Sequence, residues 1–118
     1  MMIVDDEKEI RELFRDVLES RGYEVLTCDS GYAALQVVNG RSVFAAFVDN
    51  RMPGMDGVET LKALKAAAPD MPVVMITGYA RDEAVEDALR SGCFVCMMKP
   101  FNLRDVLSIL DIIEVGGR

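Results

Sequence analysis

The chain has 118 residues, of which 51% are hydrophobic and 28% charged, and its formal net charge is −7. This length and composition predict one soluble domain with a single core, and the apolar runs are too short to span a bilayer. The acidic balance argues against direct binding to nucleic acid or to an anionic membrane. Histidine is absent, so the chain has no histidine general base and no phosphohistidine of its own.

Short apolar runs alternate with segments of helical periodicity along the chain. The runs predict strands at residues 3–4, 23–28, 43–48, 73–76 and 94–98. Apolar residues recur at helical spacing after each run, in sets that begin at Ile10, Ala34, Val58, Ala84 and Leu103. Gly22, Gly40 and Gly92 are expected to end three helices, and Asn102 to cap the last one. Five strand–helix units predict an α/β fold, a five-stranded parallel sheet between two helical layers.

Polar residues follow the carboxyl ends of the predicted strands. Asp5 and Asp6 follow the first strand, Asp49 the third, Thr77 the fourth and Lys99 the fifth. Ligands of open parallel sheets bind at this edge. Clustered carboxylates repel one another unless a cation binds, and oxygen ligands without imidazole or thiolate suit Mg²⁺. A carboxylate beside Mg²⁺ can attack a phosphoryl group, whose other oxygens Thr77 and Lys99 can hold.

These residues resemble the receiver domain of two-component response regulators. The matching segments are Val4-Asp5-Asp6-Glu7, residues 48–57 (VDNRMPGMDG), Ile76-Thr77-Gly78 and Lys99-Pro100-Phe101. The resemblance runs through the whole chain, residues 1–118, and it implies one receiver domain, either standing alone or cut from a longer protein. It also implies the flavodoxin-like, doubly wound strand order 2-1-3-4-5. The implied function is that of a phosphoryl-accepting switch and not of an enzyme acting on other substrates.

The resemblance also implies roles for individual residues. Asp49 would accept a phosphoryl group from a histidine kinase or a histidine phosphotransfer protein. Mg²⁺ would be bound by Asp6, by Asp49 and by the backbone carbonyl of Arg51, with Asp5 acting through water. Thr77 would bind the phosphoryl group and report its presence.

Lys99 would pair with a phosphoryl oxygen, and its bond to Pro100 would be cis. Two positions, Arg51 and Tyr79, are expected to border the site and to tune its rates. One residue departs from the family pattern, because Cys96 stands where receivers commonly carry a tyrosine or phenylalanine that moves together with the threonine. Phe94 points to the same face of the strand but lies nearer its start, so it is not an obvious substitute.

Three other functions are considered. Dehalogenase-like phosphatases need an acid two residues after the nucleophile, and this chain has Arg51 there. A degenerate receiver used only for docking is disfavoured by the complete acidic set. Cys93 and Cys96 match C-x-x-C, but the motif leads into a strand, where residues three apart face opposite ways, so redox or metal chemistry is not expected. With Cys28 the cysteines number three, which predicts reduced thiols and a cytoplasmic protein.

The last predicted helix suggests an output surface. Its core stripe is formed by Leu103, Val106, Leu107, Leu110 and Ile113. Ile109 and Ile112 fall outside that stripe and are expected to face solvent. We expect them to contact a second copy of the chain or an output domain.

Overall fold

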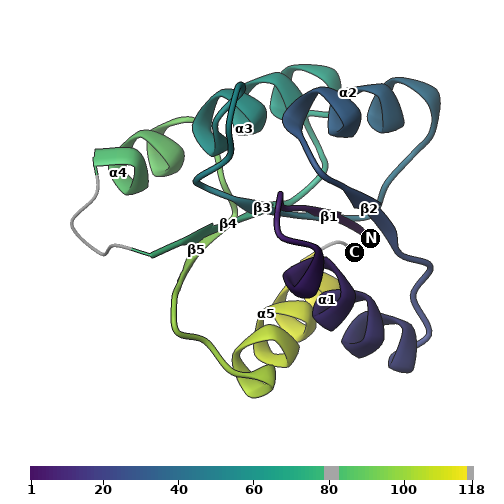
Figure 1. Ribbon diagram of the computed structural model, residues 1–118. Helices are drawn as coiled ribbons and strands as arrows, with labels where there is room; N and C mark the ends of the chain where they lie inside the picture. The colour runs from purple at the N-terminus through teal and green to yellow at the C-terminus, as the bar shows by residue number, and fades with distance from the viewer. Residues whose placement is uncertain (79–82, 117–118) are drawn as a thin grey trace.

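The computed structural model describes residues 1–78 and 83–116, which form one parallel sheet between two layers of helices (Figure 1). The strands are β1 (Met2–Val4), β2 (Leu26–Cys28), β3 (Ala46–Asp49), β4 (Val73–Thr77) and β5 (Val95–Met98). The helices are α1 (Lys8–Ser20), α2 (Gly31–Gly40), α3 (Gly57–Ala67), α4 (Glu83–Arg90) and α5 (Leu103–Gly116). All strands pair in parallel in the order β2-β1-β3-β4-β5. The predicted α/β fold and the implied 2-1-3-4-5 order are therefore confirmed.

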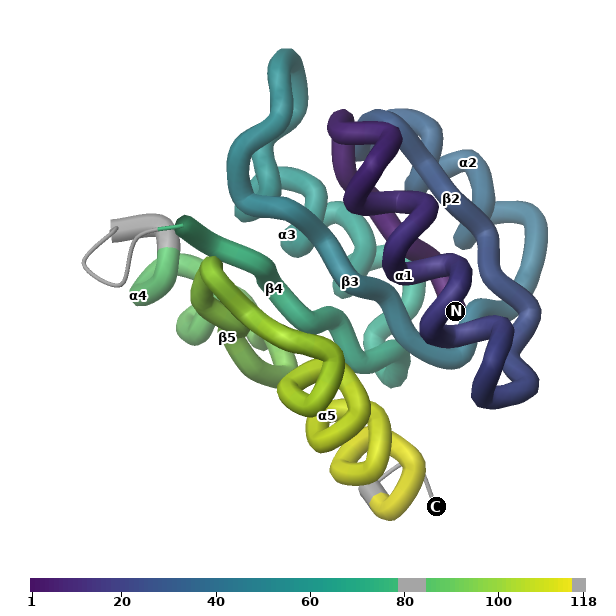
Figure 2. The backbone as a smooth tube through the Cα atoms, turned by 60° about the horizontal axis from the view of Figure 1, so that its bottom comes forward, coloured from purple at the N-terminus to yellow at the C-terminus, as the bar shows by residue number. Residues whose placement is uncertain are grey.

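Each face of the sheet carries its own hydrophobic layer. On β3, Ala46 and Val48 pack toward α2, α3 and α4, whereas Phe47, and Ala45 just before the strand, pack toward α1 and α5. Figure 2 looks onto the second face, with α1 and α5 in front of the strands. Because helices cover both faces, the central strand is apolar on both sides, as its sequence predicts. The sheet edge at the carboxyl ends of the strands is left for polar residues.

Three strands begin later than predicted, and β5 does so by a single residue, at Val95. β2 begins at Leu26 instead of Tyr23, and β3 begins at Ala46 instead of Val43. The starts of both strands follow the short β1, whose first residue, Met2, pairs with Leu26 and Ala46. Tyr23 and Phe44 instead stack on each other, with their ring centroids 6.1 Å apart.

Helix ends follow the predicted signals, with one exception. Gly22 and Gly92 have φ values of 87° and 94° after α1 and α4, a conformation that glycine adopts without strain. Asn102 caps α5, since its Oδ1 accepts from the Asp105 N–H at 3.0 Å while the Asp105 carboxylate accepts from the Asn102 N–H. The exception is Gly40, which is the last helical residue of α2 and not a left-handed stop.

Helical spacing predicts the buried face of α5 only in part. Ile112 is 58% exposed, as expected, but Leu103, assigned to the core stripe, is 49% exposed. Ile109 was expected on the solvent side and is instead half-buried against the α1/α5 layer. It stands three residues after Val106 and four before Ile113, so it borders two buried side chains. Leu103 is the first residue of α5, a few residues after the end of β5, and this first turn of the helix leaves it partly exposed.

Candidate acidic pocket at the carboxyl end of the sheet

Adjacent strands bring three carboxylates together. β1 pairs with β3, so Asp5, which follows β1, lies beside Asp49, which ends β3. One carboxylate oxygen from each of Asp5, Asp6 and Asp49 lies within 4.8 Å of the others. Asp5 and Asp49 are buried, at 1% and 4% exposure, while Asp6 is exposed to solvent. We call this group of two buried carboxylates and one exposed carboxylate the acidic pocket.

Asp5 has one satisfied oxygen and one unsatisfied oxygen. Its Oδ1 accepts a hydrogen bond of 2.8 Å from the Glu7 N–H, whereas its buried Oδ2 has no hydrogen-bond partner within the described part of the chain. Burial raises the pKa of Asp5 from 3.8 to about 6, against the opposing effect of the Glu7 N–H and with help from the charge of Asp49. A buried carboxylate oxygen without a donor suits a divalent cation or an ordered water.

Asp49 and Lys99 form an ion pair at rest. Lys99 Nζ lies 3.2 Å from Asp49 Oδ1, and the backbone N–H of Lys99 donates to the Thr77 carbonyl at 2.8 Å. Burial raises the pKa of Asp49, and the Lys99 ammonium opposes that rise. Burial alone would lower the pKa of Lys99, but its pairing with Asp49 outweighs burial, so the pKa is raised. The Lys99–Pro100 bond is cis, as expected.

The remaining predicted residues lie on neighbouring segments of this edge. Thr77 ends β4 and is 3% exposed, and Arg51 is exposed at the start of the loop that follows β3. Tyr79, expected to border the site, lies outside the described residues.

A glycine whose role the sequence did not reveal fixes the β3–α3 loop. A Cβ on Gly57 would lie 2.5 Å from Asn50 Cα and 2.7 Å from the Asp49 carbonyl oxygen. The loop therefore returns against the end of β3 at a distance that only glycine permits. Asp56 then starts α3 with a capping box to Glu59. The Asp-Gly pair at the end of the matching segment thus positions the loop, and the only available signal for this was the motif itself.

The two cysteines near β5 are not arranged as predicted. Cys93 Sγ and Cys96 Sγ lie 3.7 Å apart, so the expectation that they face opposite ways is wrong. Its premise fails because Cys93 precedes β5, which begins at Val95, and strand alternation does not extend to it. Phe94 is 41% exposed and also precedes β5, at the end of the strand far from Asp49.

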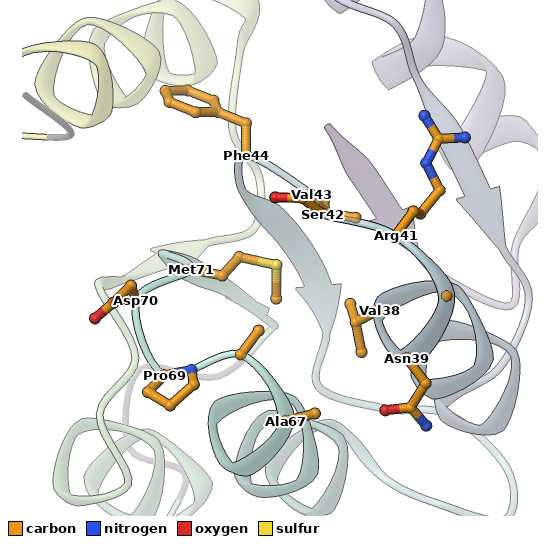
Figure 3. Close-up of a pocket in the computed structure, with 12 residues that line it drawn as sticks. Val38, Asn39, Arg41, Ser42, Val43, Phe44, Ala67, Pro69, Asp70 and Met71 are labelled. Carbon is orange, nitrogen blue, oxygen red and sulfur yellow. The ribbon is translucent and has the colours of Figure 1, made fainter.

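A separate cleft of about 640 Å³ opens at the opposite, amino-terminal end of the sheet (Figure 3). It lies between the segments that lead into β3 and β4 and includes Phe44 and Met71. Arg41 on its rim is paired with Glu24 at 3.0 Å and points away from the centre of the cleft. Charged groups do not converge here as they do at the carboxyl end, so the cleft is no rival for the functional site.

The sheet order and the acidic pocket with its lysine define a class of protein. These are doubly wound α/β domains with a cluster of carboxylates suited to a cation at the carboxyl ends of the strands. The family described as response regulator receiver domain matches residues 1–111. The chain belongs to this family, and its role is that of a phosphoryl-accepting signalling domain. The resemblance drawn from the sequence is therefore confirmed.

Individual relatives agree with this assignment. The chain is 33% identical over 106 residues to the regulatory protein AtoC of Escherichia coli, covering 90% of this chain and 23% of AtoC. It is 29% identical to sporulation initiation phosphotransferase F of Bacillus subtilis, covering 90% of this chain and 86% of that protein. The receiver domain of NtrX from Brucella abortus superimposes with a TM-score of 0.88 at 32% identity, covering 95% of each chain.

The chain spans about a quarter of the length of the first curated regulators that it matches. Receiver domains bind Mg²⁺ at an acidic pocket, and they interact with histidine kinases or phosphotransfer proteins. The described helices include none that is long and apolar enough to cross a membrane.

Proposed function

We propose that Asp49 is the phosphoacceptor of this receiver domain. The observation that carries the proposal is the position of its carboxylate, which lies 3.2 Å from the Lys99 ammonium and within 4.8 Å of oxygens from both Asp5 and Asp6. A cation bound by the three carboxylates and the Lys99 ammonium could therefore both contact a phosphoryl group on Asp49. Asp6 is exposed to solvent, whereas Asp5 is almost fully buried.

The residues present fit a bound Mg²⁺. Three carboxylates share the pocket, and the buried Oδ2 of Asp5 lacks a donor among the residues that the structure describes. Asp6, Asp49 and the backbone carbonyl of Arg51 would hold the ion directly, and Asp5 would act through water. When bound, the ion would neutralise the carboxylates and the oxygens of the incoming phosphoryl group.

In the transfer itself, an oxygen of Asp49 attacks the phosphorus of a phosphohistidine on the donor. The new O–P bond forms as the P–N bond breaks, and the donor imidazole leaves with the electron pair. Lys99 moves from the free carboxylate to a phosphoryl oxygen, and the Thr77 hydroxyl holds another. Arg51 occupies the place where a phosphatase of the dehalogenase type would carry its general acid, so the chain turns over only its own aspartyl phosphate, and slowly.

The donor is a histidine kinase or a histidine phosphotransfer protein, as for receiver domains in general, and its phosphohistidine lies outside these 118 residues, which contain no histidine. We take residues 1–118 as one receiver domain, either standing alone or belonging to a longer regulator. The three free cysteines are in keeping with a reducing compartment such as the cytoplasm.

The output surface is proposed on α5. Ile112 and Val115 are 58% and 76% exposed, and half-buried Ile109 flanks them. A second copy of the chain or an output domain would cover these side chains, and neither nucleic acid nor membrane is proposed as a direct partner of this acidic domain.

The phosphoacceptor is tested by intact-mass spectrometry. Wild type incubated with Mg²⁺ and a small acyl phosphate should gain one phosphoryl group, and Asp49→Asn should gain none. Asp16→Asn, an exposed acid on α1, is the matched control and should react like wild type. A phosphoryl gain that persists in Asp49→Asn would overturn the assignment.

The cation ligands are tested separately, by titrating Mg²⁺ into the unphosphorylated protein. Asp6→Ala should weaken binding, whereas Asp16→Asn should not. Equal affinity in wild type and Asp6→Ala would remove Asp6 from the ligand set while leaving the phosphoacceptor assignment intact.

A further inference from the structure

Two thiols are in direct contact at the start of β5. Cys93 Sγ and Cys96 Sγ are 3.7 Å apart, and both residues are half-buried. The contact arises because the chain turns sharply after α4: Gly92 has a φ of 94°, and the Cys93 N–H donates to the Ala88 carbonyl at 3.0 Å. This turn directs the Cys93 side chain back toward the strand that it is about to enter.

Both thiols pack against the layer under α2, α3 and α4. Cys96 pairs with Met75 in the sheet, and Met75 belongs to the same layer. The third thiol, Cys28, lies on β2, at the other edge of the five-stranded sheet, and is 4% exposed. Cys93 and Cys96 therefore have each other as partners, while Cys28 is an internal control.

We propose that Cys93 and Cys96 are a redox modification site that forms a reversible intramolecular disulfide with a low-molecular-weight disulfide as oxidant. Bond formation would shorten the distance between the two sulfurs from 3.7 Å to about 2.0 Å. The proposal does not depend on Asp49 or on phosphorylation.

The oxidation proceeds by two exchanges. One thiolate of the pair attacks a sulfur of the small disulfide, forming a mixed disulfide and releasing one small thiol. The second thiolate then attacks the protein sulfur of that mixed disulfide and releases the second small thiol. The pair loses two protons and two electrons, and the small disulfide gains them as two thiols.

The surroundings of the pair set its rate. Burial, together with the adjacent Cys96, raises the pKa of the Cys93 thiol to about 12. Little of this thiol is ionised at neutral pH, so exchange should be slow there and faster in alkaline buffer. This behaviour suits a site that responds to sustained oxidation and not to a brief pulse.

The bond would join the turn after α4 to β5. Cys96 stands three residues before Lys99, whose ammonium pairs with Asp49. Oxidation would therefore restrain the beginning of the strand that carries the lysine of the acidic pocket, while the pocket itself lies at the strand's other end.

The test counts free thiols. Reduced protein is equilibrated with oxidised glutathione, quenched in acid, alkylated with N-ethylmaleimide in denaturant and weighed intact. Wild type has three alkylated cysteines when reduced, and we expect one after oxidation, with no bound glutathione and with full recovery after dithiothreitol. The loss should be faster at pH 9 than at pH 7.

Variants assign the bond. Cys28→Ser should lose both of its labels on oxidation, whereas Cys93→Ser and Cys96→Ser should form no intramolecular bond and should carry glutathione instead. Circular dichroism checks that each variant is folded, and Cys93→Ala and Cys96→Ala replace any serine variant that is not. The proposal is overturned if wild type keeps three labels, if Cys93→Ser loses both of its labels without gaining glutathione, or if wild type stops at a glutathione adduct.

Discussion

The two ends of the parallel sheet differ in whether their charged side chains are buried or exposed. At the carboxyl end, Asp5 and Asp49 are buried together with a third carboxylate nearby, and one lysine, 33% exposed, lies against them. At the amino end, Arg41 and Glu24 form their pair at 3.0 Å in solvent, with side chains 50% and 74% exposed. Burying like charges costs free energy of folding, and surface pairs cost almost none. Among the described residues, that cost falls at the end of the sheet where we propose that a cation and a phosphoryl group bind.

The amino end is instead closed by packing. Tyr23 and Phe44 stack there, and the Tyr23 hydroxyl donates to the Glu114 carboxylate on α5. These contacts join the segments that lead into β2 and β3 to the last helix. The same sheet thus has one end closed by packed side chains and another at which like charges are buried together.

Replacing Asp5 should have the largest effect on this contrast. Asp5→Asn removes the most buried carboxylate but keeps its shape, so the metal-free protein should gain about 1–3 kcal/mol of unfolding free energy at pH 7.5. Mg²⁺ affinity should fall by roughly tenfold or more. Urea denaturation and Mg²⁺ titration measure the two effects, and Asp16→Asn on exposed α1 is the control. If Asp5→Asn were less stable than wild type, the buried carboxylate would not destabilise the metal-free protein.

The same residue predicts a pH dependence. The folded pKa of Asp5 is about 6, above its ordinary value of 3.8, so folding favours its protonated form. Its favourable contribution is present below pH 3.8 and is lost as the pH rises through about 6. The stability difference between wild type and Asp5→Asn should therefore be small near pH 3.5 and reach its full size above pH 6. A difference that is constant from pH 3.5 to 7.5 would contradict the raised pKa.

A smaller effect is expected from the lysine. Lys99→Met keeps the length of the side chain and removes the charge beside Asp49, which should cost about 1 kcal/mol in the metal-free protein, since Lys99 is partly exposed. In an Asp49→Asn background the same substitution should cost little. Urea denaturation of the four proteins gives the coupling energy, and additive costs would mean that the ion pair does not contribute to stability.

The sequence was a good guide to which residues share the carboxyl end of the sheet. Strand ends mark that edge, and parallel pairing brings Asp5 and Asp49 together whatever the length of each strand. The sequence was a poorer guide to how deeply individual side chains are buried and to where strands and helices begin. Leu103 fits the apolar stripe of α5 yet is 49% exposed, and Ile109 lies outside the stripe yet is half-buried, because spacing gives direction around a helix but not where the sheet beneath it stops.

The contact between Cys93 and Cys96 could not be predicted from strand periodicity. It depends on where β5 begins, and the boundary of a strand is set by its neighbour: Val95 is the first residue of β5 to pair, opposite Val74. One or two residues at such a boundary decide whether two side chains meet or point apart. The three-residue β1 acted in the same way on the starts of β2 and β3.

The smallest effect should come from the amino end. Glu24→Gln and Arg41→Gln each break an exposed pair whose net contribution is limited by solvent screening and by the entropy of two long side chains, so each should change stability by less than about 0.5 kcal/mol. Neither should alter Mg²⁺ affinity, because both lie at the far end of the sheet from the acidic pocket. Urea denaturation and the Mg²⁺ titration used for Asp5→Asn apply unchanged. If breaking this surface pair cost as much as removing Lys99, the contrast between the two ends would not lie in burial, and the stability of the domain would have to be attributed to its surface charges.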